Sequence, residues 1–197
     1  MLTIENKIIN KIKKAGRGSL FFTNDFIAYG NSKAVSKALE RLVEKGEIKR
    51  VSRGIYTRPK TSKLIGEIMP SKEDVAKAIA KRDKARIIPA GSFALNALGL
   101  STQVPVNAVF LTDGAARKMK LDYGRITFKR TTPQNLATIG KISGLVIQAL
   151  KEIGKGKVEE WEENKIIQIL KNEDESKLKH DINIAPEWIR IIMRKAL

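Results

Sequence analysis

The Lys and Arg residues of this chain are its most informative functional groups, because they can bind anions. The 197 residues hold 38 Lys and Arg against 21 Asp and Glu, a formal net charge of +17. Residues 1–60 hold 14 basic and 5 acidic residues, or +9, whereas the other 137 hold 24 and 16, or +8. A generally basic proteome would explain an overall excess but not this concentration. The charge therefore favours a polyanionic partner, which is DNA, RNA or an anionic membrane surface.

An amphipathic helix is expected to position the first group of cations. Its apolar residues recur on one face over residues 33–45, and its charged residues lie on the other. Asn31 or Ser32 is suited to cap its start, and Gly46 is suited to end it. Lys and Arg side chains on the outer face can neutralise phosphates, and Arg can also bind guanine.

A short hairpin is expected to follow this helix, over residues 47–51 and 54–57. Helices are also predicted over residues 3–15 and 24–29, so the order of elements is helix, short helix, helix, hairpin. This is the order of a winged helix-turn-helix, whose third helix enters the major groove of B-DNA. The predicted DNA-binding residues lie on the third helix and the wing: Ser32, Lys33, Ser36, Lys37, Arg41, Lys49, Arg50 and Arg53.

Two other functions remain open for the same surface. A charged helix face is often only solvated, and winged helices also serve as protein-interaction modules or bind RNA. Glu40 lies on the outer face of the predicted helix, where it is unfavourable near phosphate. Double-stranded DNA is nevertheless the favoured partner, because the pattern of elements and the charge agree. Dimerisation is not decided by the sequence, which is compatible with a monomer or a weak dimer.

The remainder of the chain is expected to form a second domain over residues 61–197, so the whole protein is predicted to be α+β. A connector is expected over residues 60–70, and the chain then alternates helices and strands before a helical end. The predicted helices are 71–83, 92–98, a short one opened by Pro133, 142–153, 158–171, 173–179 and 186–196, and the predicted strands are 86–89, 106–112 and 125–130. Trp161 and Trp188 are expected in the core.

Enzymatic chemistry is not expected, and neither is a metal or a cofactor. The chain has no Cys and a single histidine, His180, without ligand-like spacing around it. Gly91-Ser92 looks like the start of a nucleotidyltransferase active site, in which such a pair holds nucleotide phosphate and two nearby carboxylates hold magnesium. No acidic residue occurs between Asp83 and Asp113. A degenerate nucleotidyltransferase therefore remains only a minor alternative.

The cytoplasm is the expected compartment. The N-terminal residues carry charges throughout and lack the uninterrupted apolar stretch of a signal peptide. No segment approaches the length of a membrane span, so no membrane association is expected. The absence of Cys is compatible with a reducing compartment.

Three segments in this order resemble the AbiEi-type antitoxins of type IV toxin–antitoxin systems: "AVSKALERLVEKGEIKRVSRGIY", "PAGSFALNALGLSTQVP" and "HDINIAPEWIRIIMRKAL". The resemblance implies a repressor of its own operon that antagonises a nucleotidyltransferase-like toxin without a stable complex. It places operator contacts on the eight residues named above. It also implies a basic surface in the second domain, for which the candidates are Arg117, Lys118, Lys120, Arg125, Lys129 and Arg130. An RNA-associated binding protein remains the main alternative.

Overall fold

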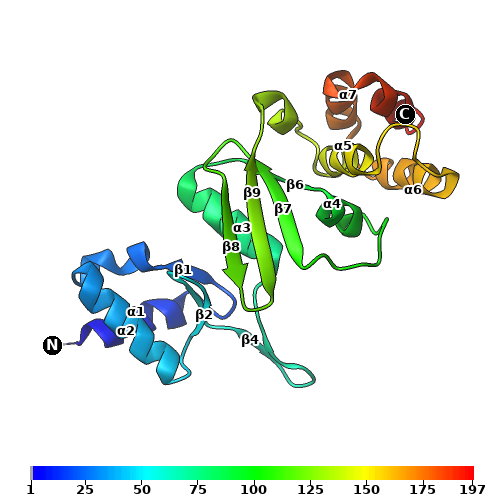
Figure 1. Ribbon diagram of the computed structural model, residues 1–197. Helices are drawn as coiled ribbons and strands as arrows, with labels where there is room; N and C mark the ends of the chain where they lie inside the picture. Colours follow the sequence, from blue (N-terminus) through cyan, green and yellow to red (C-terminus); the bar gives the residue numbers. More distant parts are fainter. Residues whose placement is uncertain (1) are drawn as a thin grey trace. The chain divides into compact units, whose positions relative to one another are not determined.

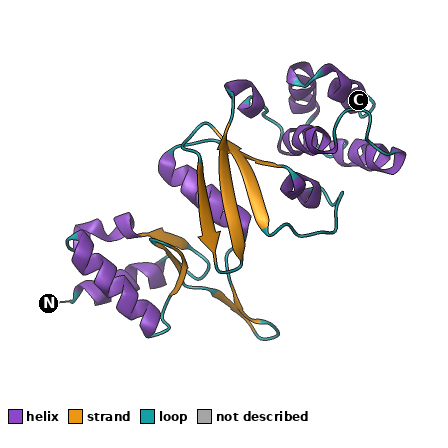
Figure 2. Cartoon of the chain, in the orientation of Figure 1, coloured by secondary structure: helices purple, strands orange, loops and turns teal. Residues whose placement is uncertain are grey.

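The computed structural model describes residues 2–197 and is a mixed α+β structure (Figures 1 and 2). Its contacts divide the chain into two compact units. The first unit comprises residues 1–78 and 120–122, and the second comprises residues 79–119 and 123–197. The expected boundary after residue 60 thus lies inside the first unit. Among the described residues, none of the helices has both the length and the apolar character that a membrane crossing requires.

The first unit begins with three helical segments and a small sheet. Its elements are α1 (Ile4–Lys14), β1 (Leu20–Phe22), the 3₁₀ helix η1 (Thr23–Tyr29), α2 (Ser32–Glu44), β2 (Lys49–Ser52), β3 (Ile55–Thr57), β4 (Lys60–Ser62) and β5 (Gly66–Ile68). Strands β1, β3 and β2 form an antiparallel sheet in that order. A core of apolar side chains from α1, η1, α2 and the sheet holds these elements together.

The two α-helices of this core start where side chains satisfy their free amides. Thr3 Oγ1 accepts from Asn6 N at 3.2 Å, and Asn31 Oδ1 accepts from Ala34 N at 2.8 Å. Helix α2 then buries one stripe of residues, Val35, Ala38, Leu39 and Leu42. Gly46 has φ 72°, a conformation that favours glycine, and it turns the chain out of α2. The predicted third helix is confirmed within one residue at each end.

Three strands of the first unit were not expected from the sequence. The segment predicted as a connector, residues 60–70, contains the antiparallel hairpin β4–β5. Its strands have three residues each and no alternation of apolar and polar residues, so the pattern gave no signal. Residues 20–22 were too short to assign by period, and they form β1 beside β3.

Helix α3 (Lys72–Asp83) contains the boundary between the units. A capping box forms its start. Asp74 N donates to Ser71 Oγ at 3.1 Å, and Ser71 N donates to Asp74 Oδ2 at 3.3 Å. Val75 and Ile79 of this helix are fully buried.

The second unit contains a helical end and most of a four-stranded mixed sheet, of which residues 120 and 121 are assigned to the first unit. Its strands are β6 (Ile87–Ala90), β7 (Asn107–Thr112), β8 (Arg117–Leu121) and β9 (Gly124–Arg130), and its other elements are α4 (Ser92–Ala97), the 3₁₀ helix η2 (Pro133–Leu136), α5 (Lys141–Ile153), α6 (Glu160–Leu170), α7 (Glu175–Ile184) and α8 (Glu187–Arg194). The strand order is β6-β7-β9-β8, with β6 antiparallel to β7 and β7 parallel to β9. Strand β8 was absent from the sequence prediction.

The helical end packs around α5, as Figure 1 shows in yellow to red. Apolar side chains from α4 to α8 form one buried cluster, which includes Leu150, Ile166 and Ile189. Trp188 packs against this cluster as predicted, but Trp161 does not, because its residue remains 51% exposed. Instead, Trp161 Nε1 donates to the Glu159 carboxylate at the start of α6.

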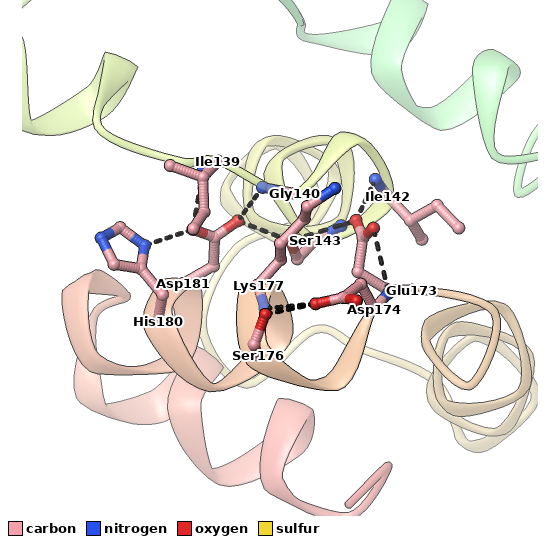
Figure 3. A network of polar contacts seen from close by, with 10 residues as sticks. All are labelled: Ile139, Gly140, Ile142, Ser143, Glu173, Asp174, Ser176, Lys177, His180 and Asp181. Atoms are coloured by element: carbon pink, nitrogen blue, oxygen red, sulfur yellow. Dashed lines mark hydrogen bonds and ion pairs between the residues drawn. The ribbon is translucent and has the colours of Figure 1, made fainter.

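Two carboxylates, one from α7 and one from the turn before it, cap the start of α5 (Figure 3). Asp181 is fully buried and accepts from Ile139 N and Gly140 N at 3.0 Å each and from Ser143 Oγ at 2.5 Å. Glu173 Oε2 accepts from Ile142 N at 2.7 Å. The four free amides of a helix start would otherwise be left without partners. The network therefore ties α7 and the α6–α7 turn to α5.

Candidate nucleic-acid interface

The outer face of α2 carries the first predicted DNA-binding residues. Ser32, Lys33 and Lys37 are exposed, and Ser36 is half-buried at the edge of this face. Lys33 and Lys37 occupy its first two turns. Glu40 and Glu44 are also exposed and occupy the following turns. The face that α2 offers to a ligand is therefore positive near its start and negative near its end.

Arg41 points to one flank of α2 rather than along the centre of its outer face. Together with Lys37, it lines a shallow pocket of about 340 Å³ between α2 and the start of α1. Thr3, Ile4 and Glu5 line the other side of this pocket. Arg41 is thus placed to reach an anion beside the helix, such as a backbone phosphate, more easily than an anion or base directly in front of it.

The opposite flank of α2 adjoins the β2–β3 hairpin at Tyr56. This buried phenol hydrogen-bonds Thr23, and the charges of Arg50 on β2 and Glu40 on α2 both act on it. Burial raises the pKa of Tyr56 above its ordinary value of 10.0, Arg50 opposes that rise and Glu40 adds to it. Tyr56 belongs to the same apolar core as the buried side of α2, so the hairpin and α2 are held in one packed unit.

The hairpin itself presents two exposed guanidinium groups and one partly neutralised ammonium group. Arg50 and Arg53 are exposed, and Gly54, with φ 72°, makes the tight turn between the strands. Lys49 is half-buried, and its Nζ lies 3.3 Å from Glu67 Oε2 on β5. Lys49 is therefore the one hairpin cation with a carboxylate partner among the described residues.

Most of the predicted DNA-binding cations have no acidic partner. In residues 2–197 the structure gives no ion pair to Lys33, Lys37, Arg41 or Arg53. Elsewhere in the same unit cations are paired: Lys13 Nζ lies 3.4 Å from Glu47 Oε2, and Lys45 pairs with Glu5. Exposed cations of α1 and of the β4–β5 hairpin also lack an ion pair among the described residues, so the cations of α2 and the β2–β3 hairpin are part of a wider set that remains free to bind an external anion.

The basic residues predicted in the second domain differ in their exposure and in their contacts with the fold. Arg117 is bound to the Asp83 carboxylate, and its guanidinium carbon lies 5.2 Å from the centre of the Phe128 ring. These two contacts hold the Arg117 side chain within the fold. The other candidates are exposed: Lys118, Lys120, Arg125, Lys129 and Arg130.

Gly91 and Ser92 border a pocket of about 290 Å³ in the second unit. The residues of β7 that line it are Val109 and Leu111, which cannot bind a metal ion, and β9 adds the cation Lys129. The fold does bring one carboxylate there, because a β-carbon at Gly91 would lie 3.7 Å from Glu152 Oε2 on α5. The sequence search missed Glu152, which is far from Gly91 along the chain. Among the described residues no group of three His, Cys, Asp or Glu is placed to hold a metal ion.

His180 is in contact with a buried carboxylate rather than with other metal-binding side chains. Its Nδ1 lies 2.8 Å from Asp181 Oδ1, and its side chain is 44% exposed. This position is consistent with the structural or solvent-exposed role predicted from its isolation in the sequence.

Comparison with known proteins identifies a family but not an activity. A search of curated proteins finds no match to the chain. The model of one family, described as "Family of unknown function (DUF6088)", matches residues 7–178. Because this match spans most of the sequence, the chain belongs to the DUF6088 family.

Proposed function

We propose that this protein is a DNA-binding transcriptional repressor whose first unit is a winged helix-turn-helix. The observation that carries the proposal is the gathering of unpaired cations on α2 and the β2–β3 hairpin, including Lys33, Lys37 and Arg53. Cations without internal partners release counterions when they bind phosphate, which is the main source of affinity for DNA. The adjoining helix and hairpin give this charge the form of a duplex-binding surface.

The distribution of charge along α2 suggests how the helix would lie in the major groove. Recognition helices contact base edges mainly with their first turns. In α2 these turns carry Ser32, Lys33, Ser36 and Lys37, which can donate to bases or phosphates. Glu40, one turn on, can accept from a cytosine amino group, so it need not oppose binding at a matching site.

Arg41 and the hairpin cations are assigned to the phosphate backbone on either side of α2. Arg41 lies on the flank next to α1, whereas Arg50 and Arg53 lie on the β2–β3 hairpin beyond the other flank. Contacts of this kind fix the position and orientation of a protein on the duplex but do not select a sequence.

We further propose that the protein is the antitoxin of a type IV toxin–antitoxin system in the cytoplasm. It would repress its own operon and antagonise a nucleotidyltransferase-like toxin without forming a stable complex. This part of the proposal rests on the resemblance of three sequence segments to AbiEi-type antitoxins. The exposed cations of the second unit, such as Arg125 and Lys129, are candidates for this role.

The DNA-binding proposal is tested with the DNA upstream of the protein's own gene. Fluorescence anisotropy should give specific binding that a shuffled duplex of equal length does not reproduce at the same salt concentration. Structured RNA should compete poorly. Equal affinity for the upstream and shuffled duplexes would contradict a repressor, and stronger competition by RNA would favour an RNA-associated protein.

The antitoxin proposal is tested in cells. If a neighbouring gene encodes a nucleotidyltransferase-like protein, its induction should arrest growth, and co-expression of this protein should restore it. A pull-down of the two purified proteins should recover little complex. Growth arrest that co-expression does not relieve would contradict the proposal, and a stable complex would show a different type of antitoxin.

A further inference from the structure

The β4–β5 hairpin exposes large apolar side chains at its tip. Leu64 is 94% exposed and Ile65 is 74% exposed, and they are neighbours in the turn between the two strands. Ile68, at the end of β5, is 39% exposed. The apolar core of the first unit includes none of these residues. An isolated two-stranded hairpin is only marginally stable in water. Because the apolar side chains at this tip are exposed, they add no stability to the fold.

The base of this hairpin is tied to the proposed DNA-binding surface. Lys60 and Ile68 are paired where the hairpin leaves the preceding strand, directly after Pro59. Arg17 Nη1 donates to Pro59 O at 3.1 Å, and Glu67 on β5 is paired with Lys49 on β2. The hairpin therefore continues from the strands that carry Arg50 and Arg53.

Charge around the tip favours a polyanion over an acidic or neutral partner. Lys60 and Lys63 are exposed, and Lys63 immediately precedes Leu64. The single carboxylate of the hairpin, Glu67, is occupied by Lys49. Apolar tip residues flanked by Lys match the combination that proteins use in the minor groove, where cations bind phosphates and an apolar wedge enters between base pairs.

The length of the hairpin is suited to such a contact. Each strand has three residues, so the arm extends about 10 Å at a rise of roughly 3.4 Å per residue. The minor groove is about 7.5 Å deep, so the tip can reach the base edges while Lys60 stays near the backbone.

We propose that the β4–β5 hairpin is a second DNA-contacting arm, whose Leu64–Ile65 tip enters the minor groove, separates two stacked base pairs and bends the duplex. The inference rests on the proposed DNA-binding function and adds to it a deformation of the target. Sequences with easily unstacked pyrimidine–purine steps next to the α2 site would then be preferred, since they are less costly to kink.

The test measures DNA bending and affinity together. A duplex carrying donor and acceptor dyes at its ends, and 2-aminopurine at candidate steps, is titrated with the wild-type chain and with Leu64→Ser/Ile65→Ser. We expect the wild type to bend the duplex and to raise the 2-aminopurine fluorescence. The tip variant should lose both signals and bind about tenfold more weakly. A matched control, Ile191→Ser/Leu197→Ser, removes two exposed apolar side chains from the second unit and should bind and bend as the wild type does.

Each other outcome has a definite meaning. Wild-type binding without bending, or a tip variant that bends DNA normally, would overturn the arm while leaving the proposed repressor intact. A wild-type chain that does not bind its upstream duplex would overturn the repressor and the arm together. If sedimentation shows that the tip substitutions dissociate a dimer and bending is unchanged, the tip binds a second copy of the chain and the DNA-contacting arm is wrong.

Discussion

Two groups of charged side chains, one in each unit of this protein, are used in opposite ways. In the first unit, Lys33, Lys37 and Arg53 have no acidic partner among the described residues and lie exposed. In the second unit, Asp181 is completely buried and bonded to the start of α5, and Arg117 is held by Asp83. The comparison teaches that net charge does not reveal function by itself. Exposed cations without an ion pair among the described residues also occur in the second unit, so what sets the first group apart is its position on a helix and a hairpin that share one core.

This difference predicts that removing a buried or bonded charge of the second unit reduces stability, whereas removing an unpaired cation of α2 or the β2–β3 hairpin reduces binding. The substitutions below test the comparison, beginning with the largest expected effect.

Asp181→Ala should destabilise the second unit by about 3 kcal/mol, because it leaves the buried Gly140 amide, the partly buried Ile139 amide and the buried Ser143 hydroxyl without this acceptor. Urea denaturation measures the change. Glu175→Ala is the control: its exposed carboxylate pairs only with Lys179 one turn away, and its removal should change stability by less than about 0.5 kcal/mol. Affinity for DNA under native conditions should be unchanged. Equal stability losses in both variants would contradict the structural role of the network.

Arg117→Ala should destabilise the second unit by about 1 kcal/mol at neutral pH, since it removes an ion pair with Asp83 and a contact with the Phe128 ring. Hydrogen bonds from Arg82 and Arg117 hold the pKa of Asp83 below its ordinary value of 3.8. A carboxylate with a lowered pKa contributes stability above about pH 4 and loses it as pH falls through its folded-state pKa.

The Arg117→Ala variant should therefore lose stability less steeply than the wild type when urea denaturation is repeated from pH 4 down to pH 2. Lys118→Ala removes the neighbouring exposed charge and serves as the control. A variant with the wild-type acid dependence would show that Arg117 does not act on Asp83.

Glu67→Gln should have the smallest effect, and it should strengthen DNA binding rather than weaken the protein. The substitution releases Lys49 from its ion pair and removes a negative charge beside the proposed interface. DNA affinity should rise about two- to threefold at low salt, and stability should change by less than about 1 kcal/mol. Anisotropy titrations of the two proteins measure the difference. Weaker binding would indicate that the Lys49–Glu67 pair itself orients the hairpin on DNA.

The first unit was the more predictable region because its signals are local. Thr3 and Asn31 cap their helices within three residues, Gly46 ends α2, and the apolar stripe of α2 has a helical period. The β4–β5 hairpin was not predicted because its strands have only three residues and carry no buried face. A turn signal was present at Gly66, but a connector and a hairpin both accommodate glycine.

The second unit depends on contacts that sequence spacing does not reveal. Asp181 and Glu173 lie 38 and 30 residues from Ser143, yet they meet at the start of α5. Strand β8 alternates charged and apolar residues over only four positions, from Lys118 to Leu121, and Glu152 reaches Gly91 only through the packing of α5. The sequence indicates which residues are candidates for DNA binding, but it does not show which of them form ion pairs with carboxylates. Thus Lys49 was grouped with free cations although Glu67 partly neutralises it.

The central claim is that the unpaired cations of α2 and the β2–β3 hairpin bind DNA phosphates. The most direct test is the salt dependence of affinity for the upstream duplex, compared between Lys37→Ala/Arg53→Ala and Lys155→Ala/Lys171→Ala. Both pairs remove two exposed positive charges, from the proposed interface and from the second unit respectively. The first pair should weaken binding at least tenfold and make the slope of log K against log salt shallower by about 2, and the second should leave the slope unchanged. Equal changes in the two double variants, or an unaltered slope in the first, would contradict the account.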